Sequence, residues 1–411
     1  MKTVAEAQTL ILEQVTPLPA THVAADEALG LILAETIASD LDSPPHDKSV
    51  VDGYAVCAAD FSGGEKTVCL RVLEEVTAGQ VPTHSLSPGT ATRIMTGAPI
   101  PQNTDGIVMI ERTKLSTDER QVEILEPRFT HGMNITRRGT SLKKEEVVLR
   151  PGVLLRGIEL GLLAEVGRAN VKIQPRPRVA ILATGNELVP VNEFPAAGQI
   201  RNSNGPLLTG LVRQAGGEPL VLGVARDTAE SLREKITQGL CAADVLVLSG
   251  GVSAGVLDLV PSMLVAVGVA EVFHKVNLKP GKPLWFGVRE HEVRGQLVFG
   301  LPGNPVSSLV CFELFVRPAL AKLQGQSEVL PRMIPARLTT EHKVRGERVT
   351  YWPAQLTTTT EESPGNVSQQ VTPLPWRGSG DLRTLAEANA LAVFPMEGTY
   401  ESGTCVEVVM L

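Results

Sequence analysis

Apolar positions at helical spacing mark the start of the chain. From Val4 to Val15 they fall every three or four residues, which predicts an amphipathic helix, and the interval Ala24–Ile37 predicts a second helix. Glu6 and Glu13 interrupt the first segment, so we expect a helix there and not a secretory signal. No apolar run approaches the roughly 20 residues that a helix needs to cross a bilayer. We therefore expect no membrane association.

Short apolar runs bounded by Gly, Pro and Asn follow this helical part. Pro44 and Pro45 break the helical pattern, and the next runs are GGEKTVCLRVLEEV, GTATRIMTGAPIPQNTDGIVMIER and RQVEILEP. Such runs predict a small β domain that extends to about Arg138. The segment GVLLRGIELGLLAEVG then predicts a helix that ends at Gly167, and the proline-containing stretch Pro175–Val179 predicts a linker.

The middle of the chain alternates buried strands with helices. VAILATG (Val179–Gly185), PLVLGVA and DVLVLSGG (Asp244–Gly251) have the continuous apolar character of buried strands, and PLLTGLVRQAG and AESLREKITQGL are helical stretches between them. This alternation predicts a three-layer α/β domain whose mainly parallel sheet is covered on both faces. Ligands of such sheets bind beyond the carboxyl ends of the strands, so the glycine-rich strand ends mark the candidate site.

The last part of the chain returns to short β-like runs. A long helix is predicted over Val306–Leu323, and after Gln324 the runs RMIPARLT, RVTYWPAQL, NALAVFP and CVEVVML predict a separate C-terminal β domain. The fold class expected from the whole pattern is multidomain α/β plus β. The α/β domain stands in the centre, with an N-terminal helical and β region on one side and the C-terminal β domain on the other.

Composition narrows the class of protein. A chain of 411 residues with 43% hydrophobic and 20% charged residues is a folded protein of two to four domains. The net charge of −7 and the aromatic content of 4% count against a protein that coats nucleic acid or an acidic membrane. The five cysteines are scattered and never spaced as CxxC, which argues against structural zinc and disulfides and favours a cytoplasmic protein with reduced thiols.

The strongest local signal is SGGVSAGVLD, residues Ser249 to Asp258. It follows an apolar strand directly and is expected to start a helix, whose backbone N–H groups favour a phosphate. Asp258 would hold a metal ion on that phosphate. The alternative is a tight strand–helix turn with Asp258 as a solvated acid. For an isolated motif that alternative is preferred, but the other strand ends of the domain count against it.

Three further segments border predicted strand ends. In KVNLKPGKP the lysines Lys275, Lys279 and Lys282 crowd a stiff loop, which favours an oxyanion site over a solvated basic loop. GLPGNPVSS resembles only the start of a helix. ATGNELV, with RNSN and RD farther on, contributes Glu187 and Asp227, which would join Asp258 as ligands of Mg²⁺. Each of the two carboxylates by itself is better explained as a helix cap or a surface acid.

The residues alone support an α/β enzyme that acts on a phosphorylated or nucleotide-linked substrate with a divalent metal. No general base or nucleophile stands out. Phosphoryl chemistry depends mostly on positioning, charge and metal, so this absence is tolerable. In the small β domain, DKSVVDGYAV and RIMTGAPIP predict loops and nothing more specific.

Several motifs in this order resemble the MoeA and gephyrin E-domain family over nearly the whole chain. They are DGYAV, IMTGAPIP, TGNEL, RNSN, SGGVSAGVLD, KPGKP, LPGNPVS and GSGDLRTLAEANAL, and their joint occurrence is highly specific. The resemblance implies a central domain of the molybdopterin-binding type and four domains per subunit. We place these at 1–37 with 138–174 (an elongated linker domain, from which part of 1–20 is free to pack elsewhere), 38–137, 175–326 and 327–411.

The resemblance also implies an activity. Members of this family take adenylylated molybdopterin and molybdate, cleave the phosphoanhydride, release AMP and insert molybdenum into the dithiolene, with Mg²⁺ as cofactor. The implied assembly is a homodimer with a composite active site. The implied partners are molybdopterin adenylyltransferase and cofactor-accepting enzymes, and neither nucleic acid nor a membrane is expected.

Site roles carry over onto matching residues. The expected catalytic residues are Asp52 (contributed by the partner subunit), Asp227, Asp258, Lys275 and Lys279, and the metal ligands are Glu187, Asp227 and Asp258. By similarity, Arg348 and Ser379 would complete the molybdate pocket. The full set of expected substrate-binding residues is Thr184, Gly185, Glu187, Ser249, Gly250, Gly251, Ser253, Gly255, Lys282, Pro302, Gly303, Asn304, Arg348 and Ser379.

Two departures and three alternatives accompany this assignment. Thr140 and Ser141 stand where the family usually has an acidic pair, and Pro353 lies near the position of a second arginine. One alternative is the upstream adenylyl transfer, which usually occurs on a small single-domain chain. Another is a pyridine-nucleotide hydrolase, which lacks the DGYAV and GSGDL domains. The third is a non-catalytic carrier or scaffold, to which the Thr140–Ser141 departure lends weight.

Overall fold

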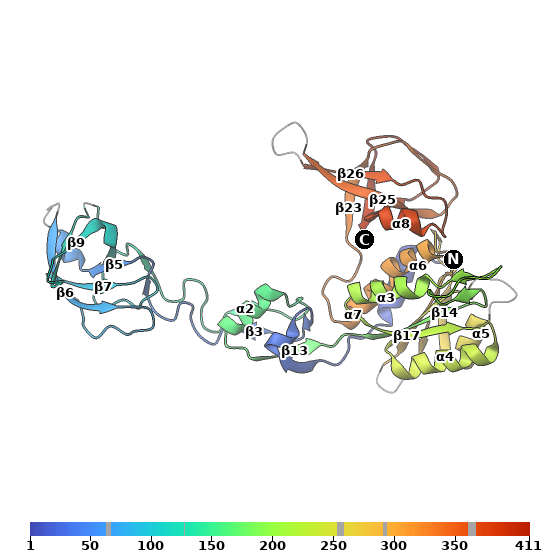
Figure 1. Cartoon of the computed structure of the whole chain (residues 1–411), viewed down its shortest axis with the longest axis horizontal. Coiled ribbons are helices and arrows are strands. Elements are labelled where there is room, and N and C mark those ends of the chain that lie inside the picture. Colours follow the sequence, from blue (N-terminus) through green and yellow to red (C-terminus); the bar gives the residue numbers. More distant parts are fainter. Residues whose placement is uncertain (63–66, 127, 253–258, 291–293, 361–366) are drawn as a thin grey trace. The chain divides into compact units, whose positions relative to one another are not determined.

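The computed structural model describes residues 1–62, 67–126, 128–252, 259–290, 294–360 and 367–411 (Figure 1). The chain forms two compact units. The first unit contains residues 1–35, 151–160 and 170–411, and the second contains residues 36–150 and 161–169. Each unit is described by itself below. No helix within the described ranges combines the length and the apolar character that crossing a membrane requires.

A six-stranded mixed sheet organises the first unit. Its strand order is β17-β14-β18-β22-β21-β19. Strands β17, β14, β18 and β22 run parallel to one another, whereas β21 is antiparallel to both of its neighbours, β22 and β19. The bounds are β14 Arg178–Thr184, β17 Glu218–Ala225, β18 Val245–Ser249, β19 Val269–His274, β21 Trp285–Arg289 and β22 Gln296–Leu301. The continuous apolar runs of the central strands are buried, which confirms the α/β domain predicted from the sequence.

Helices cover both faces of this sheet. One face carries α3 (Asn204–Gln214), α6 (Pro305–Cys311), a π-helical turn at Phe312–Val316 and α7 (Arg317–Leu323), and the other carries α4 (Ala229–Ala242) and α5 (Val260–Ala266). Both layers flank the sheet in Figure 1. The helix predicted over residues 306–323 is therefore present, with a π-helical turn in its middle.

The N-terminal helix α1 (Val4–Glu13) packs on this α/β region. Thr3 caps it, since the Thr3 hydroxyl accepts from the Glu6 N–H and the Glu6 carboxylate accepts from the Thr3 N–H. The buried side chains of Ala7 and Ile11 belong to the same apolar cluster as α6 and α7. Gln8 also donates from Nε2 to the Leu314 carbonyl oxygen at 3.0 Å.

The helix predicted over Ala24–Ile37 is wrong. The segment forms β1 (Thr21–Ala24), a 3₁₀ turn at Ala25–Ala28 and β2 (Ile32–Leu33), and β13 (Asn170–Gln174) lies between the two strands. Gly30 has a φ of 73°, a left-handed conformation that ends the turn. Both strands pair with β13, a segment far along the chain. Helical periodicity in the sequence does not reveal such long-range pairing.

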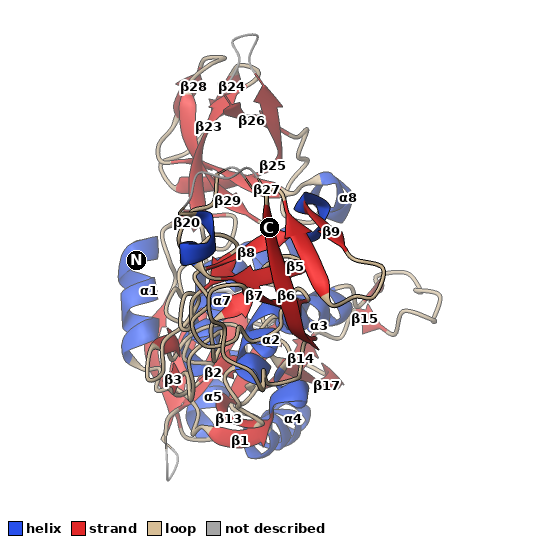
Figure 2. Cartoon of the chain, turned by 90° about the vertical axis from the view of Figure 1, so that its left-hand side faces the viewer, coloured by secondary structure: helices blue, strands red, loops and turns tan. Residues whose placement is uncertain are grey.

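The C-terminal part of the first unit is a second six-stranded sheet, and the four strands predicted there are confirmed. Its order is β20-β25-β26-β23-β29-β27, and β25 also pairs with β27. Figure 2 shows these strands and the short pair β24–β28. The bounds are β20 Leu278–Lys279, β23 Met333–Leu338, β24 His342–Val344, β25 Val349–Thr360, β26 Val367–Pro373, α8 Leu382–Glu387, β27 Ala390–Phe394, β28 Gly398–Tyr400 and β29 Cys405–Met410.

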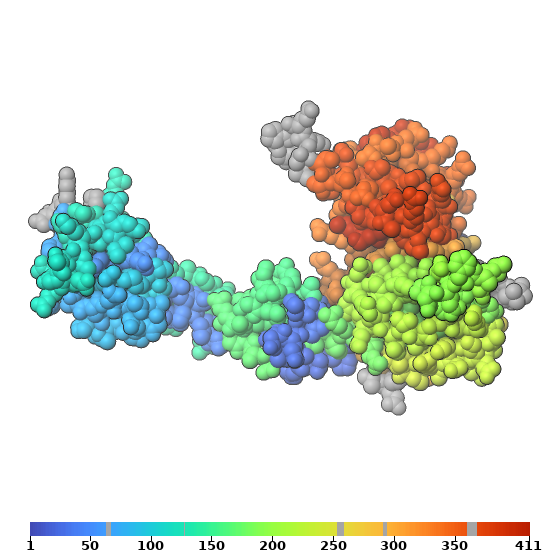
Figure 3. Space-filling model, viewed as in Figure 1, coloured from blue at the N-terminus to red at the C-terminus, as the bar shows by residue number. Residues whose placement is uncertain are grey.

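The α/β region and the C-terminal sheet are joined by backbone contacts. Strand β20 lies in sequence between β19 and β21 of the central sheet, yet it pairs in parallel with β25 of the C-terminal sheet. The Val306 N–H at the start of α6 donates to the Ser379 carbonyl oxygen at 3.0 Å. Figure 3 shows the surfaces of the two regions in direct contact, green to yellow against orange to red. Residues of both regions can therefore line one site.

The second unit, residues 36–150 and 161–169, contains the short strands predicted for the small β region. Its main sheet has the order β8-β5-β7-β6-β10-β9, and its core contains Tyr54, Leu70 and Val108. The bounds are β3 Ile37–Ala38, β4 Lys48–Ser49, β5 Gly53–Val56, β6 Val68–Val76, β7 Thr90–Ile94, β8 Gly106–Met109, β9 Thr113–Leu115, β10 Gln121–Ile124, β11 Ile135–Thr136 and β12 Val147–Leu149, with 3₁₀ turns at Ala58–Phe61 and Ile110–Arg112. Helix α2 (Gly157–Glu165) is the helix predicted to end at Gly167.

The predicted linker at residues 175–179 is shorter than expected. Arg178 and Val179 already belong to β14, and β13 ends at Gln174. Only residues 175–177 separate the two strands. The short pair β15 (Leu188–Val189) and β16 (Ile200–Arg201) completes the first unit.

Candidate active site

The carboxyl ends of the parallel strands meet at one edge of the central sheet and line a cavity of ≈ 380 Å³. The residues after β14 contribute Gly185 and Glu187, and the residue pair after β17 contributes Asp227. The remaining predicted lining residues are Thr184, Ser249, Gly250, Gly251, Pro302, Gly303 and Asn304. The structure thus brings together most of the predicted phosphate-side residues. Ser253, Gly255 and Asp258 lie outside the described residues.

Glycines are required at the end of β18. Gly250 has a φ of 97°, and a Cβ at this position would lie 2.6 Å from the Thr184 carbonyl oxygen. Gly251 has a φ of 65°, and a Cβ there would lie 2.6 Å from Cγ2 of Val260. These close approaches let the end of β18 pack on the end of β14 and on α5 without side chains between them. A ligand can then reach backbone groups at the floor of the cavity.

One buried asparagine braces the cavity. The Asn204 side chain, at the start of α3, donates from Nδ2 to Ser249 Oγ at 2.6 Å and to the Gly303 carbonyl oxygen at 2.7 Å. Asn204 is buried, so both hydrogen bonds are shielded from water. The sequence motif RNSN contained this residue without revealing its role, which depends on two strand ends that are distant in sequence.

The carboxylates of Glu187 and Asp227 are exposed and follow the ends of β14 and β17. The Asn186 N–H donates to Asp227 Oδ2 and the Asp227 N–H donates to Asn186 Oδ1, both at 3.1 Å. Arg226 Nη1 donates to the carbonyl oxygens of Asn186 and Leu188 at 3.1 and 3.3 Å. These bonds fix the loop that carries Glu187 beside Asp227, and both acids line the same cavity.

This pair suits Mg²⁺, which is commonly held by one or two carboxylates together with substrate phosphates. Over the described ranges no group of three or more His, Cys, Asp or Glu side chains is placed to hold a metal ion. The third predicted ligand, Asp258, is outside those ranges. The fit therefore rests on Glu187 and Asp227 alone, on the side of the cavity where the glycine turns would receive a phosphate.

A second cavity of ≈ 470 Å³ lies between the α/β region and the C-terminal sheet. Lys279, Lys282, Arg348 and Ser379 all line it. The lysine loop predicted an oxyanion site and the family resemblance added Arg348 and Ser379 to it; these residues come from two different regions. The parallel pairing of β20 with β25 brings the lysine loop next to Arg348.

Backbone contacts hold the cationic groups in place. Arg348 Nη1 donates to the Leu278 carbonyl oxygen at 3.2 Å, and Lys279 Nζ donates to the Arg345 carbonyl oxygen at 3.2 Å. Gly281 packs closely on α6, where a Cβ would lie 2.7 Å from Cys311 Sγ. Lys282 is exposed. Cationic donors fixed in this way suit a small dianion, because little further ordering is needed on binding.

Lys275 is not among the residues that line either cavity. Its φ is 76°, and its N–H donates to the Leu284 carbonyl oxygen at 2.8 Å, so it forms part of the turn that starts the loop. Asp52 belongs to the second unit, where its Oδ1 accepts from the Thr96 N–H at 2.7 Å and from Thr96 Oγ1 at 2.8 Å. These bonds hold the pKa of the Asp52 carboxyl below its ordinary value.

Thr140 and Ser141 also belong to the second unit and are exposed. Thr140 Oγ1 donates to the Arg137 carbonyl oxygen at 2.5 Å, and the Ser141 N–H donates to the Ser43 carbonyl oxygen at 2.9 Å. The turn is thus closed by neutral groups where relatives were expected to carry acids.

Two aromatic residues in the second cavity were missed by the sequence analysis. Trp352, on β25, and Trp376, after β26, line it together with the cationic groups. Their only signal in the sequence was that two of three tryptophans occur in one part of a chain with few aromatic residues. Their meeting depends on the pairing of β25 with β26, which the sequence analysis did not predict.

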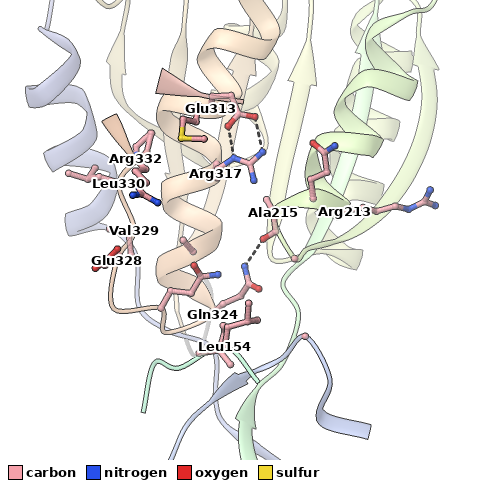
Figure 4. A pocket seen from close by; sticks show the side chains of 18 of the residues that line it. Leu154, Arg213, Ala215, Glu313, Arg317, Gln324, Glu328, Val329, Leu330 and Arg332 are labelled. Atoms are coloured by element: carbon pink, nitrogen blue, oxygen red, sulfur yellow. Dashed lines mark hydrogen bonds and ion pairs between the residues drawn. The ribbon is translucent and has the colours of Figure 1, made fainter. Parts of the chain in front are cut away.

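A larger cavity of ≈ 710 Å³ is elsewhere in the first unit and contains none of the predicted site residues. Figure 4 shows two of its polar side chains, Arg317 and Gln324, paired with neighbouring groups. Arg317 Nη2 donates to Glu313 Oε1 at 2.8 Å, and Gln324 Nε2 donates to the Ala215 carbonyl oxygen at 2.9 Å. The candidate chemistry therefore belongs to the two smaller cavities.

These two cavities adjoin. Pro283, Pro302 and Asn304 line both of them. One side offers glycine turns and carboxylates, and the other offers lysines and an arginine. A single ligand could therefore contact both sets of groups at once.

Three family models together match most of the chain. The model of the MoeA N-terminal region (domain I and II) matches residues 2–167, and the probable molybdopterin binding domain matches residues 180–322. The MoeA C-terminal region (domain IV) matches residues 335–411. These matches confirm the resemblance inferred from the motifs.

Curated relatives and solved structures agree. A molybdopterin molybdenumtransferase of Staphylococcus aureus (strain COL) is 33% identical over 410 residues, which cover 99% of this chain and 95% of the relative. One of Staphylococcus epidermidis (strain ATCC 12228 / FDA PCI 1200) is 32% identical over 411 residues, with the same coverage. A molybdopterin biosynthesis MoeA protein from Pyrococcus horikoshii OT3 has a TM-score of 0.82 at 30% identity and covers 100% of both chains.

A molybdenum cofactor biosynthesis protein from Pyrococcus furiosus shares the fold, with a TM-score of 0.59, 18% identity and coverage of 100% of both chains. The full-length relatives named as transferases do not favour the adenylyltransferase, hydrolase or carrier alternatives. The chain belongs to the MoeA family of molybdopterin molybdenumtransferases, enzymes of molybdenum-cofactor biosynthesis.

Proposed function

We propose that this chain inserts molybdenum from molybdate into adenylylated molybdopterin and releases AMP. The observation that carries the proposal is the junction of the two cavities at Pro283, Pro302 and Asn304. A substrate that spans this junction has its phosphoanhydride on the side of the glycine turns and its metal-accepting group on the side of the lysines.

The residues divide the work as follows. Backbone groups at Gly250 and Gly251 receive the adenylyl phosphate, because no side chain blocks their approach. Lys279, Lys282 and Arg348 hold molybdate, a tetrahedral dianion, through charge-assisted hydrogen bonds, and Ser379 adds a hydroxyl. Lys275 orders the loop through its backbone, which makes it a positioning residue in this proposal and not a ligand.

Mg²⁺ would be held by Glu187 and Asp227, with Asp258 as the third expected ligand. When bound, it would neutralise charge on the phosphoanhydride as AMP departs. The carboxylates supply the oxygen ligands that this cation prefers. A mononucleotide product then leaves from the side of the cavity that faces the strand ends.

We further propose a homodimer with composite sites, in which Asp52 of the partner subunit reaches this cleft. The test is complementation. Asp52→Ala and Lys279→Ala are each expected to be inactive, and mixed dimers of the two variants are expected to regain part of the activity, since one of their two sites keeps both residues. No recovery after verified subunit exchange would contradict the composite site.

A cytoplasmic location, and exchange of substrate with molybdopterin adenylyltransferase and cofactor-accepting enzymes, complete the proposal.

The deciding experiment measures AMP release from adenylylated molybdopterin with Mg²⁺, with and without molybdate. We expect release that depends on molybdate and is lost in Asp258→Ala and Lys279→Ala. Lys343→Ala is the control, because Lys343 is exposed on β24 and is not among the residues that line either cavity. Tight substrate binding without AMP release would overturn the enzymatic assignment.

A further inference from the structure

The second cavity is larger than an oxyanion requires. At ≈ 470 Å³ it falls within the range of about 300–1,000 Å³ that is usual for organic ligands. A tetrahedral dianion held by Lys279, Lys282 and Arg348 would occupy a small part of it. Another part of the substrate must therefore fill the remaining space.

Trp352 and Trp376 form the aromatic wall of that space. Trp352 Nε1 donates to the Leu374 carbonyl oxygen at 2.8 Å, and Trp376 Nε1 donates to the Gly378 carbonyl oxygen. Both indole N–H groups are thus engaged by the backbone. The tryptophans offer a ligand their ring surfaces and no free donor.

The two rings are held in fixed orientations. Their centroids lie 4.9 Å apart with an interplanar angle of 88°. His342 packs against Trp352, with 4.4 Å between the ring centroids, and it stacks on Phe394 at 4.8 Å. A wall of this kind is ordered before a ligand arrives, so binding does not carry the entropic penalty of ordering it.

The distribution of tryptophans strengthens this point. The chain has three tryptophans, and two of them line this cavity. The third, Trp285, is fully buried, and its Nε1 donates to Glu271 Oε2 at 2.9 Å. Aromatic side chains are otherwise scarce, at 4% of residues. Two partly exposed indoles at one cationic pocket are what a planar heterocycle would require for stacking.

We propose that Trp352 and Trp376 form a subsite for the pterin ring system of the substrate, next to the oxyanion-binding residues. Ser307 and Ser379 line the same cavity and supply hydroxyls for the polar edge of the ring. This inference rests on the proposed function, because the pterin is part of that substrate. It makes the adenine ring an occupant of the other cavity, beside the glycine turns.

A binding experiment tests the subsite without turnover. The full-length protein is labelled with 5-fluorotryptophan, and its three fluorine resonances are assigned with Trp352→Phe and Trp376→Phe. The probes are 6-hydroxymethylpterin and, separately, AMP. We expect the pterin to shift the resonances of Trp352 and Trp376 and leave that of Trp285 unchanged, and we expect AMP to move none of them. Shifts caused by AMP and not by the pterin would overturn the assignment.

Kinetics then separates this inference from the proposed function. Trp376→Leu is expected to raise KM for adenylylated molybdopterin about tenfold or more, because loss of one stacking ring commonly has that effect. KM for molybdate and kcat should change little, and Trp376→Phe should restore most of the affinity. The control is Tyr400→Leu, an aromatic residue of the same region that is not among the lining residues.

The outcomes are distinct. Molybdate-dependent AMP release with unchanged KM in Trp376→Leu would refute the pterin subsite and leave the transferase intact. Failure of wild-type AMP release would refute the transferase, whereas the fluorine experiment would still report on pterin binding. Thermal unfolding of each variant identifies one that has failed to fold, and the fluorine experiment on the wild type then decides whether the pterin subsite exists.

Discussion

Asn204 donates to Ser249 across 2.6 Å and thereby ties the start of α3 to the end of β18. The same Nδ2 group donates to the Gly303 carbonyl oxygen, so one buried amide spans three chain segments at the floor of the phosphate-side cavity. The geometry of the strand ends thus depends on a side chain that need not touch the reacting atoms.

Asn204→Asp is expected to destabilise the protein by about 2 kcal/mol, because a carboxylate cannot donate and faces the Gly303 carbonyl oxygen in a buried site. Asn204→Ala should have a similar effect through loss of both bonds. Chemical denaturation checks both, with the exposed Asn170→Ala as control. Wild-type stability of Asn204→Asp would show that the brace does not matter.

Two glycine substitutions should have opposite effects. Gly250→Ala forces a residue with a φ of 97° to carry a Cβ only 2.6 Å from the Thr184 carbonyl oxygen. We expect a loss of at least about 2 kcal/mol of stability, and loss of AMP release. Gly210→Ala lies within α3, where an added Cβ meets nothing within 4 Å, and should gain roughly 0.5–1 kcal/mol. Thermal unfolding compares the pair, and equal effects would contradict this explanation.

The sequence predicted those features that depend on local pattern. The buried runs of β14 and β18 and the glycines that follow them were recognisable because each motif is contiguous. Lys279 and Lys282 were placed together for the same reason, and both line one cavity. Arg348 and Ser379 were identified only through the family resemblance, because contacts between distant segments bring them to that pocket. The pairing of β20 with β25 places Arg348 there, and the Val306 N–H holds the Ser379 carbonyl oxygen.

Features that depend on distant pairing were missed. Residues 24–37 have helical periodicity, yet they form a 3₁₀ turn and short strands, of which Ile32–Leu33 pairs with β13. Trp352 and Trp376 lie far apart in sequence, and the antiparallel pairing of β25 with β26 brings them together. Lys275 is a lysine like Lys279 and Lys282 on the same loop. Its positive φ, which the sequence does not reveal, sets it apart from those two cavity-lining residues. Periodicity and motif spacing contain no information on these points.

Lys282→Met is expected to raise KM for molybdate about tenfold without changing stability. Lys282 is exposed and lines the cationic cavity, so its charge serves binding more than folding, and methionine keeps a similar unbranched stem. The difference between variant and wild type should shrink as salt is added, because salt screens the lost attraction. Lys343→Ala is again the control. An unchanged KM for molybdate would place the oxyanion away from this lysine.

His342 makes the stability of the C-terminal sheet sensitive to acid. Burial lowers the pKa of His342 below its ordinary value of 6.5, and its Nε2 has no hydrogen-bond partner within the described part of the chain. The folded protein therefore keeps this ring neutral, whereas the unfolded chain takes up a proton near its ordinary pKa. The stability that depends on the neutral ring is complete above 6.5 and is lost as the pH falls from there towards the folded-state pKa.

His342→Phe should remove this part of the acid sensitivity, because phenylalanine can still pack on Trp352 and Phe394 but binds no proton. Denaturant unfolding followed by tryptophan fluorescence, from about pH 7.5 to about pH 5, measures the effect. The free energy of unfolding of the wild type should fall more steeply over this range than that of the variant. Parallel curves would mean that His342 is not the group responsible, since the variant differs in no other titratable side chain.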